Sequence, residues 1–184
     1  MRYAALLRAV NVGGRKVTMA ELKAAAAKLG HVNCRTLVAS GNLVFDAKKT
    51  APAKLETALE AAIETTFGLF SEVMVRDPSQ WAAILKANPF LKKAKEDPAH
   101  LVCVICKDAP DDALLAADLK SFREKYDKGE QIKVVGREVY IDYGRSIGQS
   151  KLILPKKACT GTARNWNTML KLEAWPKDKI PAGA

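Results

Sequence analysis

Apolar and polar residues in the first 77 positions alternate between a strand-like period of two and a helix-like period. Short apolar runs at 3–8 ("YAALLR") and 71–76 ("SEVMVR") predict two strands. Between them, one helical stripe follows the capping box of Thr18 and Glu21, and a second runs from 52 to 67. The segments "RTLVAS" and "NLVFD" flank Gly41, which predicts a hairpin between the two helices.

The second half repeats much of this pattern. A short helix around Trp81 precedes the apolar run "HLVCVICK", a predicted strand, and a helical stripe extends from 111 to about 126. The segments "QIKVV" and "EVYID" then flank Gly136, just as the earlier pair flanks Gly41. We expect a final helix from about 162 to 175, with these residues inward: Ala163, Trp166, Leu170 and Ala174. No closing strand is expected after that helix, so the repeat is predicted to be imperfect.

The order strand, helix, strand, strand, helix, strand is that of the split βαβ, or ferredoxin-like, arrangement. The pattern therefore predicts an α+β fold with an internal duplication: two pseudo-repeated ferredoxin-like subdomains with antiparallel sheets. We place the first at 1–77 and the second at 78–175, with a loose tail at 176–184. The alternative is that any two α+β segments look alike at this level.

Composition and charge predict where in the cell the protein is located and what class of partner it binds. The chain has 184 residues, no apolar stretch long enough to cross a membrane, and an N-terminal apolar run that Arg8 interrupts, so we expect a cytoplasmic protein without a membrane partner. Its formal charge is +10, which favours an anionic partner such as a phosphorylated small molecule or nucleic acid.

The four cysteines form no regular framework, which fits a reducing cytosol. Cys103 and Cys106 have C-x-x-C spacing, but residues three apart on a strand point to opposite faces. Only His31 and His100 are available to complete a metal set. We therefore predict no metal site and no cofactor.

Basic residues are concentrated in two stretches, 1–20 and 143–172, that contain no acidic residue. Each stretch carries a turn that leads to a predicted helix start, where backbone N–H groups bind anions. We expect an anion-binding, phosphate-accepting site where the two halves meet, formed by these residues: Arg8, Asn11, Gly13, Gly14, Arg15, Lys16, Lys151, Arg164 and Asn165.

Structural alternatives stand beside this hypothesis. Gly13 and Gly14 suit a simple strand-to-helix turn, because glycine is common in such loops. Arg164 and the asparagines near it suit helix capping and hydrogen bonds between the halves. Trp166 fits the core better than a stacking platform. Asp46 and Asp142 occupy matching hairpin ends, where a carboxylate pair or two solvated residues are both compatible with the pattern.

Other functions remain in competition, and no catalytic set emerges. One is hydrolysis of a phosphorylated or acyl-phosphate small molecule, suggested by the analogy between the Arg15 loop and an acylphosphatase phosphate cradle. Another is RNA binding, ranked lower, with Tyr140 and Tyr143 as stacking candidates. A structural or partner-binding role is the last.

The segments "YAALLRAVNVGG…VTMAELKAAAAKLG", "SGNLVF" and "GTARNWNTMLKL" resemble a bacterial family catalogued as domain of unknown function 1697. The resemblance extends from Tyr3 to about Leu172 and implies a pair of ferredoxin-like subdomains, with no established activity or catalytic residue. "SKLILPKKACTG" departs from the family pattern, because Pro155 disrupts a helix interior. A broken helix and a loop followed by a helix are both open there.

Overall fold

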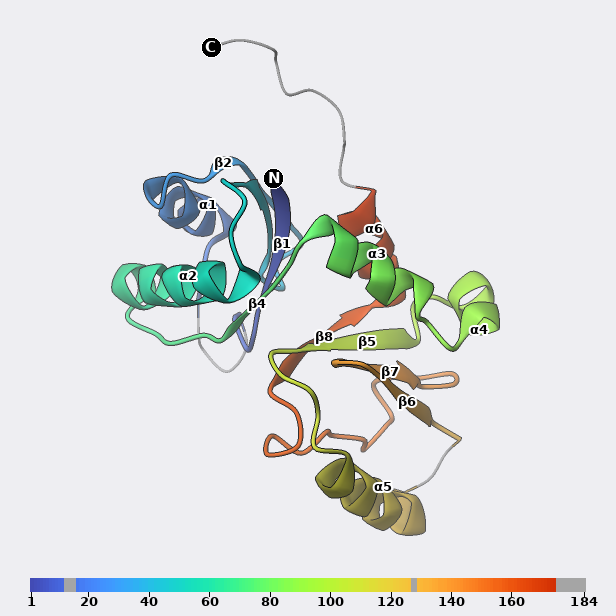
Figure 1. The fold of residues 1–184 in the computed structure, drawn as a ribbon. Helices are drawn as coiled ribbons and strands as arrows, with labels where there is room; N and C mark the ends of the chain where they lie inside the picture. The colour runs from blue at the N-terminus through green and yellow to red at the C-terminus, as the bar shows by residue number, and fades with distance from the viewer. Residues whose placement is uncertain (12–15, 127–128, 175–184) are drawn as a thin grey trace.

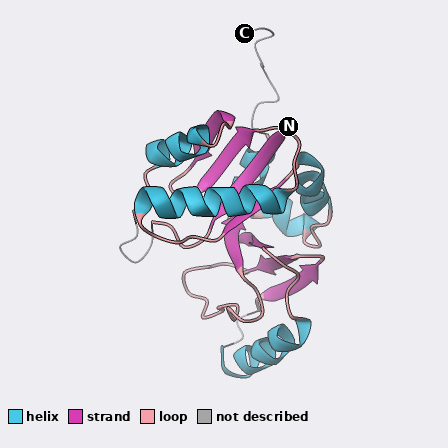
Figure 2. Ribbon diagram, turned by 60° about the vertical axis from the view of Figure 1, so that its left-hand side comes forward, coloured by secondary structure: helices cyan, strands magenta, loops and turns pink. Residues whose placement is uncertain are grey.

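The first 77 residues form a four-stranded antiparallel sheet in the computed structural model, which describes residues 1–11, 16–126 and 129–174 (Figure 1). Its strand order is β2-β3-β1-β4, with these bounds: β1 (Arg2–Leu7), β2 (Val32–Leu37), β3 (Asn42–Asp46) and β4 (Val73–Arg76). Helices α1 (Met19–Lys28) and α2 (Pro52–Phe67) cover one face of this first sheet, as Figure 2 shows.

A second four-stranded antiparallel sheet follows, ordered β6-β7-β5-β8. Its strands are β5 (Leu101–Cys106), β6 (Gln131–Val135), β7 (Glu138–Asp142) and β8 (Gly161–Asn165). The helices of this part are α3 (Pro78–Lys86), α4 (Leu91–Glu96), α5 (Asp112–Tyr126) and α6 (Trp166–Glu173). Helix α5 packs on the outer face of the second sheet, whereas α3 and α6 lie beside each other between the two sheets (Figure 1).

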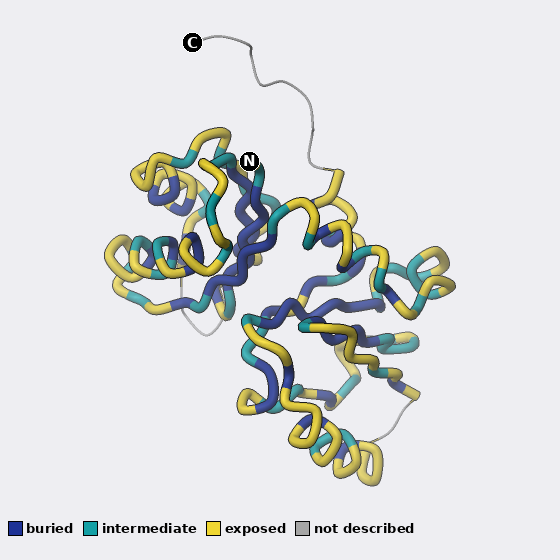
Figure 3. Tube along the Cα trace, viewed as in Figure 1, coloured by how far each residue is buried: buried dark blue, intermediate teal, exposed yellow. Residues whose placement is uncertain are grey.

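Strands β1 and β5 are buried on both faces because each is a central strand covered on two sides (Figure 3). Alternate residues of β1, such as Tyr3 and Leu7, pack against α1 and α2, while Leu6 faces the other sheet. In β5, Cys103 likewise faces the junction and Cys106 faces α5. A middle core therefore joins the two halves, built from both sheets together with α3 and α6.

The predicted α+β class with antiparallel sheets is confirmed, and the first six elements follow the predicted order. Thr18 caps α1 by accepting a hydrogen bond from the Glu21 N–H. Gly68 ends α2 in the left-handed region, at φ 62°, where a side chain is disfavoured. Helix α4 was not predicted. Its six residues are too few to show a helical period.

The prediction of a helix from 162 to 175 is wrong at its first turn. Residues 161–165 form strand β8, which pairs antiparallel with β5, so the second sheet does have the closing strand that the sequence analysis lacked. The helix begins at Trp166, with Asn165 as its N-cap. Its buried residues are Trp166, Met169 and Leu172. Three residues expected to be inward are exposed instead: Ala163, Leu170 and Ala174.

The segment between β7 and β8 contains no helix, so the broken-helix alternative is wrong. The loop followed by a helix is nearer to the structure, except that strand β8 separates the loop from α6. The chain instead runs as an irregular segment that buries Leu152 and Ala158 against α5's side of the second sheet. In the part of the chain that the structure describes, no helix is both long and apolar enough to span a lipid bilayer.

Replacing Gly161 by alanine should destabilise the fold. An added Cβ would lie 2.8 Å from Val104 Cγ1 and 2.9 Å from the Ile105 carbonyl oxygen, where β8 approaches β5. Overpacking of this kind costs about 1–3 kcal/mol. Urea unfolding should report a lower midpoint for Gly161→Ala. The control is Gly148→Ala, whose Cβ meets nothing within 4 Å; equal midpoints for both variants would contradict the strand assignment.

Candidate functional site

Asn11, from the N-terminal part of the predicted anion site, forms its side-chain hydrogen bonds with the backbone of its own half. Asn11 Nδ2 donates to the carbonyls of Ala39 (2.7 Å) and Val17 (3.1 Å), and its Oδ1 accepts from the Val17 N–H at 2.9 Å. The side chain therefore ties the two ends of the loop together. Gly13, Gly14 and Arg15 lie outside the described residues.

Absence of acids along the sequence does not mean absence of acids in space. Arg8 Nη1 donates to Glu72 Oε2 at 2.5 Å, because the residue before β4 lies beside the end of β1. Lys16 and Lys151 are exposed. The described cations of the predicted set thus comprise one ion-paired arginine, two exposed lysines and Arg164.

Arg164 is buried and donates to acceptors within the chain through all three of its nitrogens. Its Nε donates to Asn42 Oδ1 (2.5 Å), and its Nη1 donates to Thr162 Oγ1 (2.7 Å) and the Ala163 carbonyl (2.8 Å). Its Nη2 donates to the carbonyls of Ser40 (2.6 Å), Leu7 (3.1 Å) and Gly41 (3.4 Å). The guanidinium has five N–H groups, and these bonds use them all.

Burial lowers the pKa of Arg164 to about 10, because no carboxylate among its described partners compensates for the loss of water. The next residue, Asn165, caps α6 by accepting from the Thr168 N–H at 3.0 Å. These contacts favour the structural alternative, in which Arg164 joins the two halves and Asn165 caps a helix.

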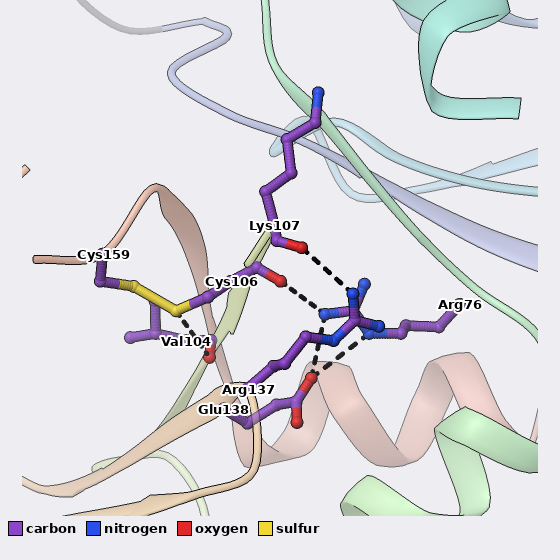
Figure 4. The surroundings of a disulfide bond; sticks show 7 residues. All are labelled: Arg76, Val104, Cys106, Lys107, Arg137, Glu138 and Cys159. Atoms are coloured by element: carbon purple, nitrogen blue, oxygen red, sulfur yellow. Dashed lines mark hydrogen bonds and ion pairs between the residues drawn. A yellow bond between two sulfur atoms is a disulfide. The ribbon is translucent and has the colours of Figure 1, made fainter. Parts of the chain in front are cut away.

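A second buried arginine, which the sequence analysis did not single out, makes the reciprocal contacts. Arg76 on β4 is 1% exposed and reaches into the second half, where its Nε (3.3 Å) and Nη2 (3.0 Å) donate to Glu138 Oε1. Its Nη2 also donates to the Cys106 carbonyl at 2.6 Å (Figure 4), and its Nη1 donates to the Val75 carbonyl at 3.0 Å.

The two arginines occupy equivalent positions in the two sheets. Arg76 lies opposite Ala4 of β1, and Arg164 lies opposite Cys103 of β5. Their acceptors correspond as well, since each Nε donates to the first residue of the other half's third strand and each Nη2 to the last carbonyl of its central strand. A charged residue at the end of an apolar strand, as in "VMVR", was the available signal.

The cysteines behave partly as predicted. Cys103 and Cys106 do lie on opposite faces of β5, but Cys106 forms a disulfide with Cys159, which differs from the thiols expected in a reducing cytosol (Figure 4). The pairing was not predictable because the residues are 53 positions apart and meet only when the segment before β8 folds over the sheet. Cys103 is a buried free thiol whose pKa is raised by burial.

The residues considered for RNA stacking and for a carboxylate pair have other partners. Tyr140 is fully buried and its hydroxyl donates to the Ile84 carbonyl at 2.7 Å, while Tyr143 is half-buried. Asp142 binds Lys93 (3.3 Å), and Asp46 binds Arg2 (3.3 Å) on the other sheet. These contacts do not favour base stacking by Tyr140.

The junction holds a cavity of about 560 Å³ that the sequence analysis did not foresee. We call it the junction cavity. Its floor is the face of the first sheet that α1 and α2 leave uncovered, at Ala4 and Val44, and its walls come from α3 and α6. Trp81 and Leu172 supply most of the apolar wall, and Ala82 is an exposed helix residue at its edge.

Charged groups of both signs border the junction cavity. Arg2, Asp46 and Arg76 belong to the first sheet, whereas Asp77 precedes α3 and Glu173 ends α6. Burial alone would raise the pKa of Asp46, but hydrogen bonds from Asn33 and Arg2 outweigh burial and hold that pKa below its ordinary value. Asp46 is therefore ionised at neutral pH, and the border has no excess of positive charge.

A family model described as "Protein of unknown function (DUF1697)" matches residues 1–140, which include the first two of the three motifs noted in the sequence but not the third, at 161–172. The fold is similar to the structure of conserved bacterial protein SP0830 from Streptococcus pneumoniae, with 23% identity and a TM-score of 0.69. That alignment covers 94% of this chain and 97% of the other. Identity this low shows a shared fold. No curated protein matches the chain.

Replacing Arg164 by methionine should lower the free energy of unfolding by about 3 kcal/mol, because buried carbonyls at Leu7 and Ser40 would lose their donor. Urea unfolding measures the change. Arg35→Met is the matched control, since Arg35 is exposed and should change stability by less than about 0.5 kcal/mol. A stable, fully folded Arg164→Met protein would contradict a structural role for this residue.

Reduction of the Cys106–Cys159 disulfide should also destabilise the protein. A crosslink between residues 53 positions apart restricts the unfolded chain, an effect worth about 4 kcal/mol in the chain-entropy model. The unfolding midpoint should therefore fall when dithiothreitol is added. Cys159→Ala should unfold at one midpoint with or without the reductant. If the unfolding midpoint of the wild type is the same with and without dithiothreitol, the crosslink does not form in solution.

Proposed function

We propose a function for this chain as a member of the DUF1697 family, to which it belongs by the match over residues 1–140: it binds a small organic molecule in the junction cavity. The proposed ligand has an apolar body and a polar end that accepts hydrogen bonds. The chain is thus proposed to be a small-molecule binding protein, and binding is the property to be tested.

The single observation that carries the proposal is the junction cavity itself. Ligand sites in proteins are concave, mostly apolar and about 300–1,000 Å³ in volume, with a few polar groups that orient the ligand. The cavity, at about 560 Å³, falls within that range, and both halves contribute to its walls. Between Trp81 and Val44 it offers an apolar slot next to polar groups at one end.

An unsatisfied donor supports a ligand with an acceptor. The indole Nε1 of Trp81, one of the wall residues, is buried and has no hydrogen-bond partner among the described residues. A buried donor without an acceptor costs about 1–3 kcal/mol, so a ligand acceptor within hydrogen-bond distance of this nitrogen would recover that cost.

The phosphate-bearing ligand predicted from the sequence remains a narrower form of this proposal. It has less support than a neutral or zwitterionic ligand, because carboxylates at Asp46, Asp77 and Glu173 balance the positive groups around the cavity. Charge balance at the border thus favours a ligand that carries little net charge.

The reciprocal arginines support a further part of the proposal, that the chain consists of two related ferredoxin-like halves, 1–77 and 78–175. Equivalent register positions hold an arginine whose acceptors lie at equivalent positions of the opposite half. The site would then lie at a junction with approximate two-fold character. No helix equivalent to α2 lies between β7 and β8 in the described residues, so the second half departs from the complete pattern.

The probe for the junction cavity is N-phenyl-1-naphthylamine, a neutral fluorophore that brightens in apolar surroundings. We expect saturable binding to the wild-type chain. Ala82→Phe should weaken it at least about tenfold, because the phenyl group enters the cavity from an exposed helix position. Ala83→Phe, the same change one residue on, borders a different cavity and should bind like the wild type.

The sulfonated analogue, 1-anilinonaphthalene-8-sulfonate, tests the phosphate-bearing form. Similar affinities for the two probes are expected for a charge-balanced border, whereas much tighter binding of the sulfonate would favour an anionic ligand. Equal binding of the neutral probe by the wild type and Ala82→Phe would overturn the junction cavity as the binding site.

A further inference from the structure

A second cavity, of about 280 Å³, lies between α3 and the β6–β7 hairpin, and we call it the hairpin pocket. One wall is apolar, formed by Ala83, Ile84 and Ala87 of α3. The opposite wall carries two guanidinium groups, from Arg76 and Arg137. The junction cavity and the hairpin pocket lie on different sides of α3, since Ala82 borders the first and Ala83 the second.

The hairpin pocket stands where the first half has a closed contact. There, the carbonyls of Ser40 and Gly41 in the β2–β3 turn accept hydrogen bonds from Arg164. Residues 136 and 137 occupy the equivalent turn of the second half, but in the described chain their carbonyls accept nothing from Arg76. The β6–β7 turn thus accepts no hydrogen bond from Arg76 in the described chain, and the hairpin pocket lies between them.

Arg137 lines the hairpin pocket and carries N–H donors. It is half-buried, and its Nη1 donates a hydrogen bond to the Lys107 carbonyl at 3.1 Å (Figure 4). Arg137 forms no ion pair with any carboxylate in the ranges that the structure describes, and Figure 4 shows its guanidinium beside that of Arg76. Burial first, and then the charge of Arg137, lower the pKa of Arg76, and these two effects outweigh the carboxylates of Glu138 and Glu56, which raise it.

Gln80 supplies a second donor from α3. Its side-chain Oε1 accepts from the Asp77 N–H at 3.1 Å in the capping box of this helix, which determines the orientation of the amide. The amide Nε2 has no hydrogen-bond acceptor among the described residues, and Gln80 lines the hairpin pocket. Arg137 and Gln80, each with side-chain N–H donors, therefore both line one small cavity.

We propose that the hairpin pocket binds a small organic carboxylate. The Arg137 guanidinium binds the head group through its fork of parallel N–H groups, the geometry that a carboxylate matches. The Gln80 amide donates to the same head group, and a short aliphatic tail packs on Ala83, Ile84 and Ala87. The Glu138 carboxylate in the same wall disfavours a dianion, so a singly charged carboxylate is preferred over phosphate.

The test is isothermal titration calorimetry of the full chain with butyrate, a four-carbon carboxylate. We expect a dissociation constant on the order of 1 mM, as for other ligands of about six heavy atoms. Arg137→Gln should weaken binding about tenfold or more by removing the charged donor. Ala83→Phe should abolish it by filling the pocket, whereas Ala82→Phe should bind butyrate like the wild type.

Inorganic phosphate is titrated in parallel. Weaker binding of phosphate than of butyrate supports the carboxylate assignment, and tighter binding of phosphate overturns it. The proposal is overturned if the wild-type protein binds no butyrate at millimolar concentrations. It is also overturned if Arg137→Gln and Ala83→Phe bind butyrate as tightly as the wild type does. Thermal unfolding of each variant shows whether it is folded. The butyrate affinity of Arg137→Lys, which keeps the charge without the paired N–H groups, should lie between those of the wild type and Arg137→Gln. Binding of N-phenyl-1-naphthylamine to the wild type and to Ala82→Phe tests the junction cavity, and its result does not depend on the butyrate measurements.

Discussion

Two buried guanidinium groups hold the molecule together by crossing from each half into the other. Arg76 donates to Cys106 and Glu138 of the second sheet, while Arg164 donates to Leu7 and Asn42 of the first. Each satisfies the last carbonyl of the other half's central strand, at the edge where the two sheets meet. Buried carbonyls require donors, and an arginine supplies several from one side chain. The relative position of the sheets follows from these contacts and the apolar core around them.

The pair is equivalent in position but not in charge. Arg76 has the carboxylate of Glu138 as its main acceptor, whereas Arg164 has the amide of Asn42 at the corresponding site. Burial without a counter-charge lowers the pKa of Arg164. The pKa of Arg76 is also lowered, by burial and by the neighbouring Arg137, although Glu138 and Glu56 raise it. The two hairpin turns differ as well. The β2–β3 turn accepts hydrogen bonds from Arg164, whereas the β6–β7 turn borders the hairpin pocket.

Helix α3 is the element that converts this junction into two cavities. It is the first element after the first sheet and packs on β1 and β4, while α6 packs beside it on the second sheet. Neither helix covers the whole exposed face of the first sheet, so the junction cavity remains above Ala4 and Val44. The hairpin of β6 and β7 reaches the opposite side of α3 and encloses the hairpin pocket.

Much of the fold was predictable because it depends on local patterns. The hydrophobic periods, the Thr18 cap, and the turns at Gly41 and Gly136 all act within a few residues, and the structure follows them. Strand β8 was mistaken for helix because five residues beside a true helix show no separate period. Its conformation depends instead on pairing with β5, at a close approach that a side chain at Gly161 would prevent.

The candidate site illustrates the same division. Linear charge patterning singled out Arg8 and Arg164, yet Glu72 lies beside Arg8 only after β4 has paired with β1, and Arg164 finds its acceptors only in the other half. By itself the sequence determined the class of fold, most elements and the family, since these depend on short-range periodicity and motifs. Tertiary structure alone decided the disulfide, the arginine crossing and both cavities, because each requires residues distant in the chain to meet across an interface.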